Sequence, residues 1–144
     1  MNTTDRMGGF IQAQIIDTRD ISGFTSTGGK VKITLKPGKS FFDVSAKKEG
    51  ISPVVSVSNE KSGQIFQIDL TINVKTPIAL KMLPFNKMIA ICKNPMGEQF
   101  VFGTHDFPLT GFKSPAFSDR AEGDTGEILT FSGKQPNYPL TLDT

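Results

Sequence analysis

The sequence predicts an all-β protein: an antiparallel β-sandwich or β-barrel with one short α-helix and one long loop. Apolar and polar side chains alternate without interruption over residues 66–74, as in a half-buried antiparallel strand. The chain of 144 residues contains 14 glycines and 9 prolines, which favours short strands joined by many turns. This length is close to the commonest size of one folding unit, so we expect residues 1–144 to form a single domain.

The first half of the chain contains the patterns of several shorter strands. From Val31 to Leu35 apolar residues again alternate with polar ones, and Pro37-Gly38 then signals a turn. We therefore expect residues 40–46 to return as the hairpin partner of this strand. Gly28-Gly29 indicates a flexible hairpin connection and not a phosphate-binding loop, because no helix follows it. Further strands are predicted over residues 10–17 and 54–58.

The middle of the chain predicts the short helix and a central strand. Thr76 can cap a helix over residues 77–83, which has a proline at its first position, where proline is tolerated. Residues 87–93 are apolar on both faces, which indicates a strand buried within a sheet. Asn94-Pro95-Met96-Gly97 then turns the chain into a strand over residues 99–102.

The last third predicts the long loop. Residues 103–126 contain four glycines and two prolines and show no periodicity, so we expect one loop over this whole segment. Loops of that length in a compact domain are usually functional or mobile. Strands over residues 127–135 and 138–142 are predicted to follow it.

The net charge is small, but the charged residues are unevenly distributed along the chain. A formal net charge of +2 is too small to indicate a nucleic-acid or anionic-membrane partner by itself. Six lysines lie between Lys30 and Lys48 against one acid, Asp43, whereas residues 118–127 are acidic. One interpretation is electrostatic complementarity between copies of the protein, or a basic track for a polyanion. The other is an ordinary solvated strand face with lysines that protect a sheet edge.

The sequence predicts a protein that folds in the cytoplasm and has no membrane partner. Residues 1–6 are polar, and no stretch approaches the roughly 20 apolar residues that a membrane span needs. The single cysteine, Cys92, excludes an intrachain disulfide and fits a reducing compartment. Because Cys92 lies in an apolar strand, we expect a buried and unreactive thiol.

Few residues are suited to catalysis. His105 is the only histidine, which excludes a site with several histidine ligands, and Asp106 could orient it toward a distant serine as in a hydrolase. The alternative is a loop histidine whose aspartate neighbour caps a turn. Segment 119–127 has oxygen donors suited to calcium but not the spacing of a helix-flanked calcium loop, so a solvated turn is the other interpretation. We expect no enzymatic activity, no cofactor and no metal.

Aromatic residues near lysines raise the possibility of nucleic-acid binding. Phe41 and Phe42 beside Lys39, and Phe112 beside Lys113, could stack on the bases of a single strand. In a β-rich chain with twelve phenylalanines and no tryptophan, most of these rings are expected in the core instead. We therefore do not expect a nucleic-acid partner.

Three runs of the sequence carry a family resemblance: Phe102-Gly103-Thr104-His105-Asp106-Phe107-Pro108-Leu109, Ser118-Asp119-Arg120, and 129–136 with Tyr138-Pro139-Leu140. They resemble small proteins of Bacteroidetes phages and prophages that belong to virion structural gene clusters. The resemblance extends more loosely to residues 16–21 and 35–39. These runs are strand and turn sequences, so the resemblance implies a structural protein and no catalytic residue.

The resemblance implies a tail component that assembles with its own copies and with other virion proteins, in the bacterial host cytoplasm and then in the virion. Phage tail-tube subunits are similar in plan, with a β-sandwich or barrel, a short helix, and long loops that reach the next subunit. A neck, tail-completion or capsid-decoration protein would use the same elements. We expect subunit contacts at Phe107, Phe112 and Phe117. The alternatives are a β-sandwich module that binds a ligand or another protein, and a β-barrel that binds single-stranded nucleic acid.

Overall fold

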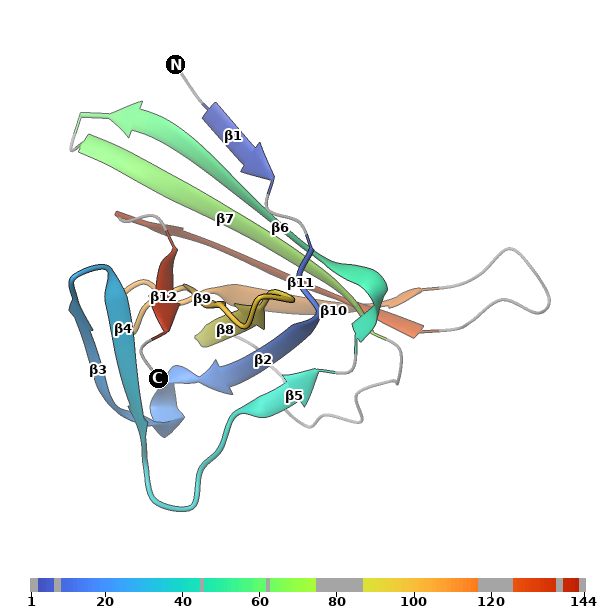
Figure 1. The fold of residues 1–144 in the computed structure, drawn as a ribbon. Coiled ribbons are helices and arrows are strands. Elements are labelled where there is room, and N and C mark those ends of the chain that lie inside the picture. The colour runs from blue at the N-terminus through green and yellow to red at the C-terminus, as the bar shows by residue number, and fades with distance from the viewer. Residues whose placement is uncertain are drawn as a thin grey trace.

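The described part of the chain forms two β-sheets (Figure 1). The computed structural model describes residues 3–6, 9–44, 46–61, 63–74, 87–116, 126–136 and 139–142, and only the backbone of residues 3–6, 47–49, 113–116 and 126–127. The five-stranded sheet has the order β1 (Thr3–Arg6), β6 (Ala46–Glu60), β7 (Gly63–Val74), β11 (Gly126–Gln135) and β10 (Thr110–Ala116). The seven-stranded sheet has the order β3 (Ile21–Thr27), β4 (Lys30–Leu35), β12 (Leu140–Leu142), β9 (Gln99–Phe102), β8 (Met88–Lys93), β2 (Gln12–Asp17) and β5 (Phe42–Val44). The predicted all-β class is confirmed.

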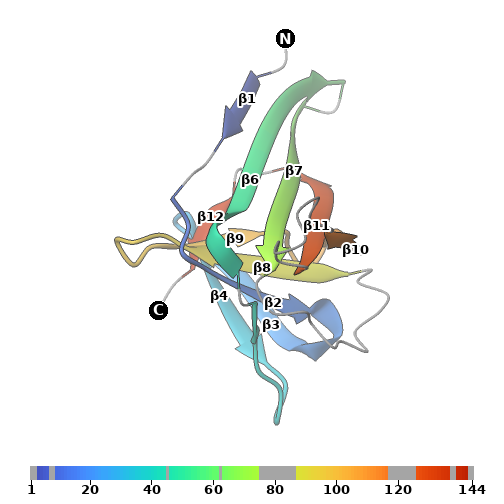
Figure 2. The same ribbon diagram turned by 90° about the vertical axis from the view of Figure 1, so that its right-hand side faces the viewer.

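The two sheets pack face to face across the main core. In Figure 2, β6 and β7 stand upright and β8 runs across below them, so the sheets cross at a large angle. The apolar residues that alternate along β7 face this core, and Ile68, Leu70 and Ile72 are fully buried there. The prediction of a half-buried antiparallel strand over residues 66–74 is therefore confirmed.

Strand β8 separates two hydrophobic clusters. Met88, Ala90 and Cys92 face the main core, whereas Ile89 and Ile91 belong to a second cluster with residues of β3, β4, β9 and β12. The seven-stranded sheet bends round so that β3 and β4 cover this second face of β8. A strand with an apolar layer on each side needs apolar residues at every position, which confirms the prediction of a central strand from residues 87–93.

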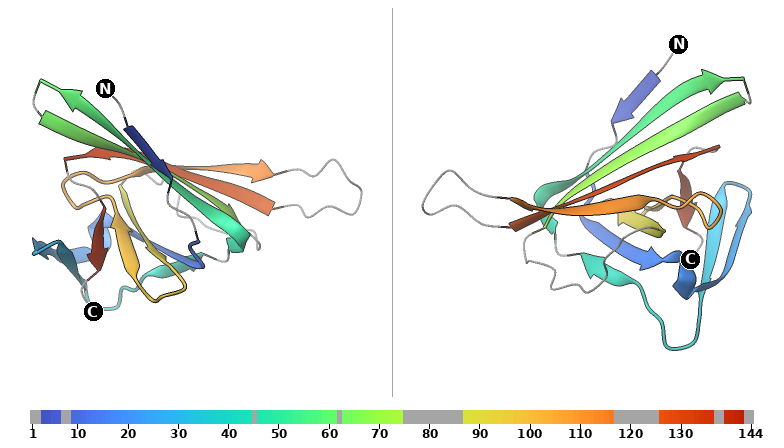
Figure 3. Two further views of the ribbon diagram at one scale, coloured as in Figure 1. Left: turned by 45° about the horizontal axis from the view of Figure 1, so that its top comes forward. Right: turned by 180° about the vertical axis from the view of Figure 1, so that it is seen from behind.

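Two hairpins extend away from the packed layers (Figure 3). β6 and β7 are 15 and 12 residues long and pair from Ala46 to Glu60, with a register shift between Ala46 and Ile51. β10 and β11 pair from Thr110↔Ser132 to Ala116↔Gly126. The far end of the β10–β11 hairpin points away from the β3–β4 hairpin in Figures 1 and 3, so these hairpins mark opposite ends of the molecule.

The predicted hairpin between residues 31–35 and 40–46 is wrong. β4 pairs with β3 and β12, and β5 pairs instead with β2, where Val44 lies opposite Ala13. Two features explain this difference. Gly28 and Gly29 both have positive φ angles, of 61° and 81°, which makes a tight turn to the preceding strand β3. Pairing with β2 also places Val44 in the main core, where it is buried.

The expectation of a single loop over residues 103–126 is also wrong in part. Thr110–Ala116 forms β10, which pairs with β11 along its whole length. The sequence hid this strand because it contains Gly111 and Pro115, but β10 is terminal among the described strands of its sheet, and a terminal strand tolerates proline at its unpaired edge. The helix predicted over 77–83 lies outside the described residues, and the helical element that they contain is the short 3-10 helix η1 (Thr18–Asp20).

Candidate interaction surface

A tight turn after β9 holds Phe107 at the surface. The backbone N–H of Thr104 donates to the carbonyl of Phe107 at 3.0 Å, and the N–H of Phe107 donates to Oγ1 of Thr104 at 2.9 Å. These two bonds close the turn, and 46% of Phe107 is exposed. Exposing a large apolar side chain from a well-bonded turn is unfavourable in water, so Phe107 is a candidate contact residue.

Gln135 fixes the start of this turn from the other sheet. Its Oε1 accepts the backbone N–H of Gly103 at 3.0 Å, and its side chain is 3% exposed. Gln135 occupies an inward position of β11, in the same alternation as Leu129 and Phe131, so a polar side chain points into the core side of the sheet. Gly103 has a φ of +87°, a conformation that favours glycine.

Leu109 holds the end of the same segment. It is 1% exposed and lies between two glycines: a Cβ on Gly103 would be 3.0 Å from its Cγ, and one on Gly133 would be 2.9 Å from its Cδ2. Gly133 therefore leaves the space that the Leu109 side chain fills. With Gln135 at one end and Leu109 at the other, the segment that presents Phe107 is anchored on both sides.

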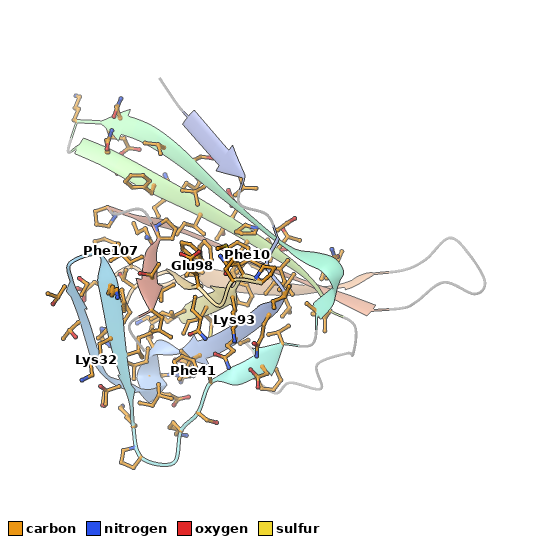
Figure 4. The ribbon with its side chains drawn as sticks, in the orientation of Figure 1. Phe10, Lys32, Phe41, Lys93, Glu98 and Phe107 are labelled. Carbon is orange, nitrogen blue, oxygen red and sulfur yellow. The ribbon has the colours of Figure 1, made fainter. Side chains whose placement is uncertain are left out.

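Phe107 lies between two hollows. The first, which we call the β3 groove, has a volume of about 330 Å³ and lies between the turn residues 104–107 and the β3 residues Ser22, Phe24 and Ser26. The second has a volume of about 260 Å³ and lies on the β7 and β11 side, at Ile65 and Lys134. Pro136 lines both hollows. Figure 4 shows Phe107 beside the end of the β3–β4 hairpin.

His105 lies in the β3 groove but is not held for acid–base chemistry. Its Nδ1 is 4.0 Å from Oδ1 of Asp106, and both side chains are more than half exposed. Ser22 and Ser26 line the same groove, yet Ser22 Oγ donates to the carbonyl of Thr34 at 3.2 Å. Among the described residues, no hydrogen bond joins His105 to either serine. The side-chain oxygen that caps the turn is Oγ1 of Thr104. The sequence had suggested Asp106 for this role.

The lysine-rich segment forms one face of β4. Lys30 and Lys32 are exposed and alternate with the buried or half-buried Val31 and Ile33. Lys36, just beyond the strand, is exposed too. The Nζ atom of Lys39 lies 3.8 Å from Oδ1 of Asp20. Lys30, Lys32 and Lys36 form no ion pair within the described part of the chain. At Lys30 and Val31 the strand is paired on both sides, by β3 and by β12, so the lysine there does not protect a sheet edge.

The structure separates the predicted contact residues. Phe112 is 64% exposed in β10, the terminal strand of the five-stranded sheet, whereas Phe107 lies at the β3 groove. Phe117 and nearly all of the acidic segment 119–127 lie outside the described residues. Sequence reasoning missed Phe24, Gln135 and Pro136; the signal for Gln135 was a polar residue at an inward position of a predicted strand.

The remaining sequence candidates are accounted for by packing. Cys92 is fully buried, which confirms the predicted burial, and this burial raises the pKa of its thiol to about 12, which favours low reactivity. Phe41 and Phe42 are half-buried and pack against the second cluster and the main core respectively, which leaves little ring surface for bases. No three His, Cys, Asp or Glu side chains gather into a metal-binding group in the described ranges. Those ranges also contain no helix that could span a membrane.

Comparison with known proteins gives no relative. No family model, no curated protein and no solved structure matches this chain.

Proposed function

We propose that this protein is a non-enzymatic, self-assembling structural protein of a phage or prophage virion, and a tail component similar in plan to tail-tube subunits. The observation that carries the self-assembly is Phe112, an aromatic residue that is 64% exposed on a terminal strand. An exposed aromatic side chain beside the free backbone edge of a strand favours association with another chain.

The long hairpins support a role in a repeating assembly. The inner part of β7, from Ile68 to Val74, packs in the main core, so the part of the β6–β7 hairpin beyond the core, from Ile68 to Gly63, extends about 17 Å at a rise of about 3.3 Å per residue. Together with β10–β11 it extends from the two packed sheets, as Figure 3 shows. Extensions of this length can reach an adjacent subunit. The tail assignment itself comes from the sequence resemblance, and a neck, tail-completion or decoration protein would use the same features.

The experiment that tests self-assembly is light scattering of the purified protein over a wide concentration range, followed by electron microscopy of the most concentrated sample. We expect the mass to increase with concentration and the images to contain rings or tubes. A constant monomer mass together with dispersed particles would contradict self-assembly by this chain alone.

Matched variants make the test specific. Phe112→Ser should weaken the association, whereas Ile11→Ser and Met96→Ser should not, although Ile11 and Met96 are 63% and 84% exposed. All three changes remove an exposed apolar side chain, so a general gain in solubility would affect them equally. Equal association by all four proteins would show that Phe112 is not part of the contact.

A ligand- or protein-binding module is the second candidate, because the β3 groove combines two aromatic side chains with the polar groups of Ser26, Thr104 and His105. Its volume of about 330 Å³ is at the lower end of the range for small-molecule sites. This function predicts a monomer that binds a member of a peptide or glycan array, with binding abolished by Phe107→Ser. Absence of binding to both arrays would count against it.

A further inference from the structure

The outer edge of β3 presents backbone groups that have no strand beside them (Figure 1). Among the described strands of the seven-stranded sheet, β3 is terminal and pairs with β4 alone. The two-residue turn Gly28-Gly29 has positive φ at both positions, which is typical of a type I′ hairpin. In such a hairpin Thr27 and Lys30 bond each other, so Phe24 and Ser26 direct their backbone N–H and C=O groups away from β4. Within the described ranges, no other backbone group bonds Phe24 or Ser26.

Two hollows lie beside this edge, on the face of β3 to which Phe24 and Ser26 belong. The β3 groove lies between these residues and Phe107. A smaller inner hollow, of about 30 Å³, adjoins the groove and shares Phe24, Ser26 and Thr104 with it. The rest of its wall is largely apolar and consists of Val31, Val101, Gly103, Gln135 and Leu140. A hollow of this size has room for about two water molecules, so it also suits a small aliphatic group from a segment lying along β3.

The opposite face of the hairpin is basic. Lys30 and Lys32 are exposed there and are about 7 Å apart, because alternate residues of a strand are separated by two rises. Figure 4 shows Lys32 on the outward side of the hairpin. The two lysines form no ion pair within the described part of the chain, so carboxylates at the same spacing on an added strand would relieve their mutual repulsion. Such a strand would lie two strand spacings from β4, about 10 Å, which a lysine and a glutamate side chain can span together.

We propose that the β3 edge binds an extended segment of another protein in which small aliphatic and acidic residues alternate. The segment adds to β3 as an antiparallel strand. Its aliphatic residues lie opposite Phe24 and Ser26, exchange backbone hydrogen bonds with them and direct their side chains to the groove and the inner hollow. Its acidic residues lie opposite Thr25 and Thr27, on the face that carries the lysines of β4. The inference rests on the second candidate function, the binding module, and names its partner; it does not depend on self-assembly.

The described edge strands of this chain do not offer such a segment to a second copy. The sequences of β1 and β10 lack the alternation of aliphatic and acidic residues. β5 reads Phe42-Asp43-Val44, but Phe42 packs against the main core and Val44 is buried in it. A different protein is therefore the better suited partner.

Charge exchange tests the basic face. The probe is the fluorescein-labelled peptide Ser-Glu-Val-Glu-Val-Glu-Ser, and its binding to the purified protein is measured by fluorescence anisotropy. The same peptide with lysine in place of glutamate should bind about tenfold or more weakly. Lys30→Glu/Lys32→Glu should reverse this preference. The control Lys61→Glu/Lys93→Glu makes the same change in net charge outside the β3–β4 hairpin and should keep the preference for the acidic peptide.

Backbone methylation tests the strand addition. Methyl groups on the valine nitrogens remove the N–H groups that donate to the carbonyls of Phe24 and Ser26, so binding should weaken about tenfold or more. Methyl groups on the glutamate nitrogens point away from β3 and should leave binding nearly unchanged. Hydrogen exchange of the Phe24 and Ser26 amides should slow when the unmodified peptide binds. The Thr25 amide, which faces β4, should change little.

The outcomes separate this inference from the proposed functions. If neither the acidic peptide nor any member of the peptide and glycan arrays binds, the binding module and this inference both fail. If array members without the alternation bind but the acidic peptide does not, or if both methylated peptides bind equally well, only this inference is wrong. Light scattering of the protein alone tests self-assembly separately, and circular dichroism of each variant confirms that it is folded.

A second copy at the β3 edge would also be detected. Ser26→Cys places an exposed thiol on β3, and the native Cys92 is buried and does not compete. We expect this variant to bind the acidic peptide and to form few disulfide-linked dimers after mild oxidation. Efficient dimer formation without peptide binding would show that β3 pairs with β3 of another copy and would overturn the proposal.

Discussion

Leu109 and Met88 exchange both of their backbone hydrogen bonds, at 2.9 and 2.8 Å, and so connect the two sheets. Met88 is the first residue of β8 in the seven-stranded sheet, and Leu109 directly precedes β10 in the five-stranded sheet. Both side chains are 1% exposed in the main core. This bridge fixes where the segment carrying Phe107 ends and where β10 begins, so it helps to set the positions of Phe107 and Phe112.

Leu109→Ala should lower the free energy of unfolding by about 2–5 kcal/mol, because it leaves a cavity in the main core. Gly133→Ala should lower it by about 1–3 kcal/mol, since its new Cβ would meet Leu109 Cδ2 at 2.9 Å. Combining the two changes should cost less than their sum, because alanine at position 109 vacates that space. Urea unfolding of the four proteins measures this coupling, and strictly additive values would contradict the contact.

Gln135→Leu should lower the free energy of unfolding by about 1–3 kcal/mol, because the buried N–H of Gly103 loses its acceptor. Hydrogen exchange at the Gly103 amide should accelerate in this variant. Lys134→Leu, at the adjacent exposed position, serves as the control and should change stability by no more than about 0.5 kcal/mol. An equally protected Gly103 amide in Gln135→Leu would show that Gln135 does not anchor the turn.

The stability of η1 should depend on acid pH through Asp17. Its carboxylate accepts the backbone N–H of Arg19 at 2.8 Å and pairs with the Arg19 guanidinium at 2.8 Å. Burial acts to raise the pKa of Asp17, but the hydrogen bonds and charge of Arg19 outweigh it and hold the pKa below its ordinary value of 3.8.

A carboxyl with a lowered folded-state pKa stabilises the protein above its unfolded pKa, and this stabilisation is lost as pH falls through the folded pKa. Asp17→Ala should therefore cost about 1 kcal/mol near neutral pH, as for a lost helix cap, and progressively less below pH 3.8. Denaturant unfolding at several pH values tests this. A difference between the two proteins that grows on acidification would contradict the role of Asp17.

The thiol of Cys92 should react with a thiol reagent only when the protein opens. Burial shields the sulfur and raises the pKa of the thiol to about 12. The Cys92 thiol of the native protein should therefore react far more slowly than an exposed thiol at pH 7, and still do so at pH 9. A Ser26→Cys variant, which adds a thiol at an exposed position of β3, provides that comparison. Fast reaction of Cys92 without denaturant would show that the centre of β8 opens readily.

The sequence by itself determined the local elements. Alternation over residues 66–74, apolar residues on both faces of 87–93, and the Asn94–Gly97 turn each predicted an element that the structure contains. These predictions succeed because burial on one or both faces of a strand is recorded in the period of its own residues.

Only the tertiary structure decided which strands pair and which side chains meet. The pairing of β5 with β2, the β10 strand within the expected loop, and the placing of Phe24, Phe107 and Gln135 around one turn all join residues far apart in the chain. Such contacts depend on the space and backbone bonds that another segment offers, as Gly133 does for Leu109. Local periodicity carries no record of them, so no single stretch of sequence could have predicted the surface that Phe107 and β3 form.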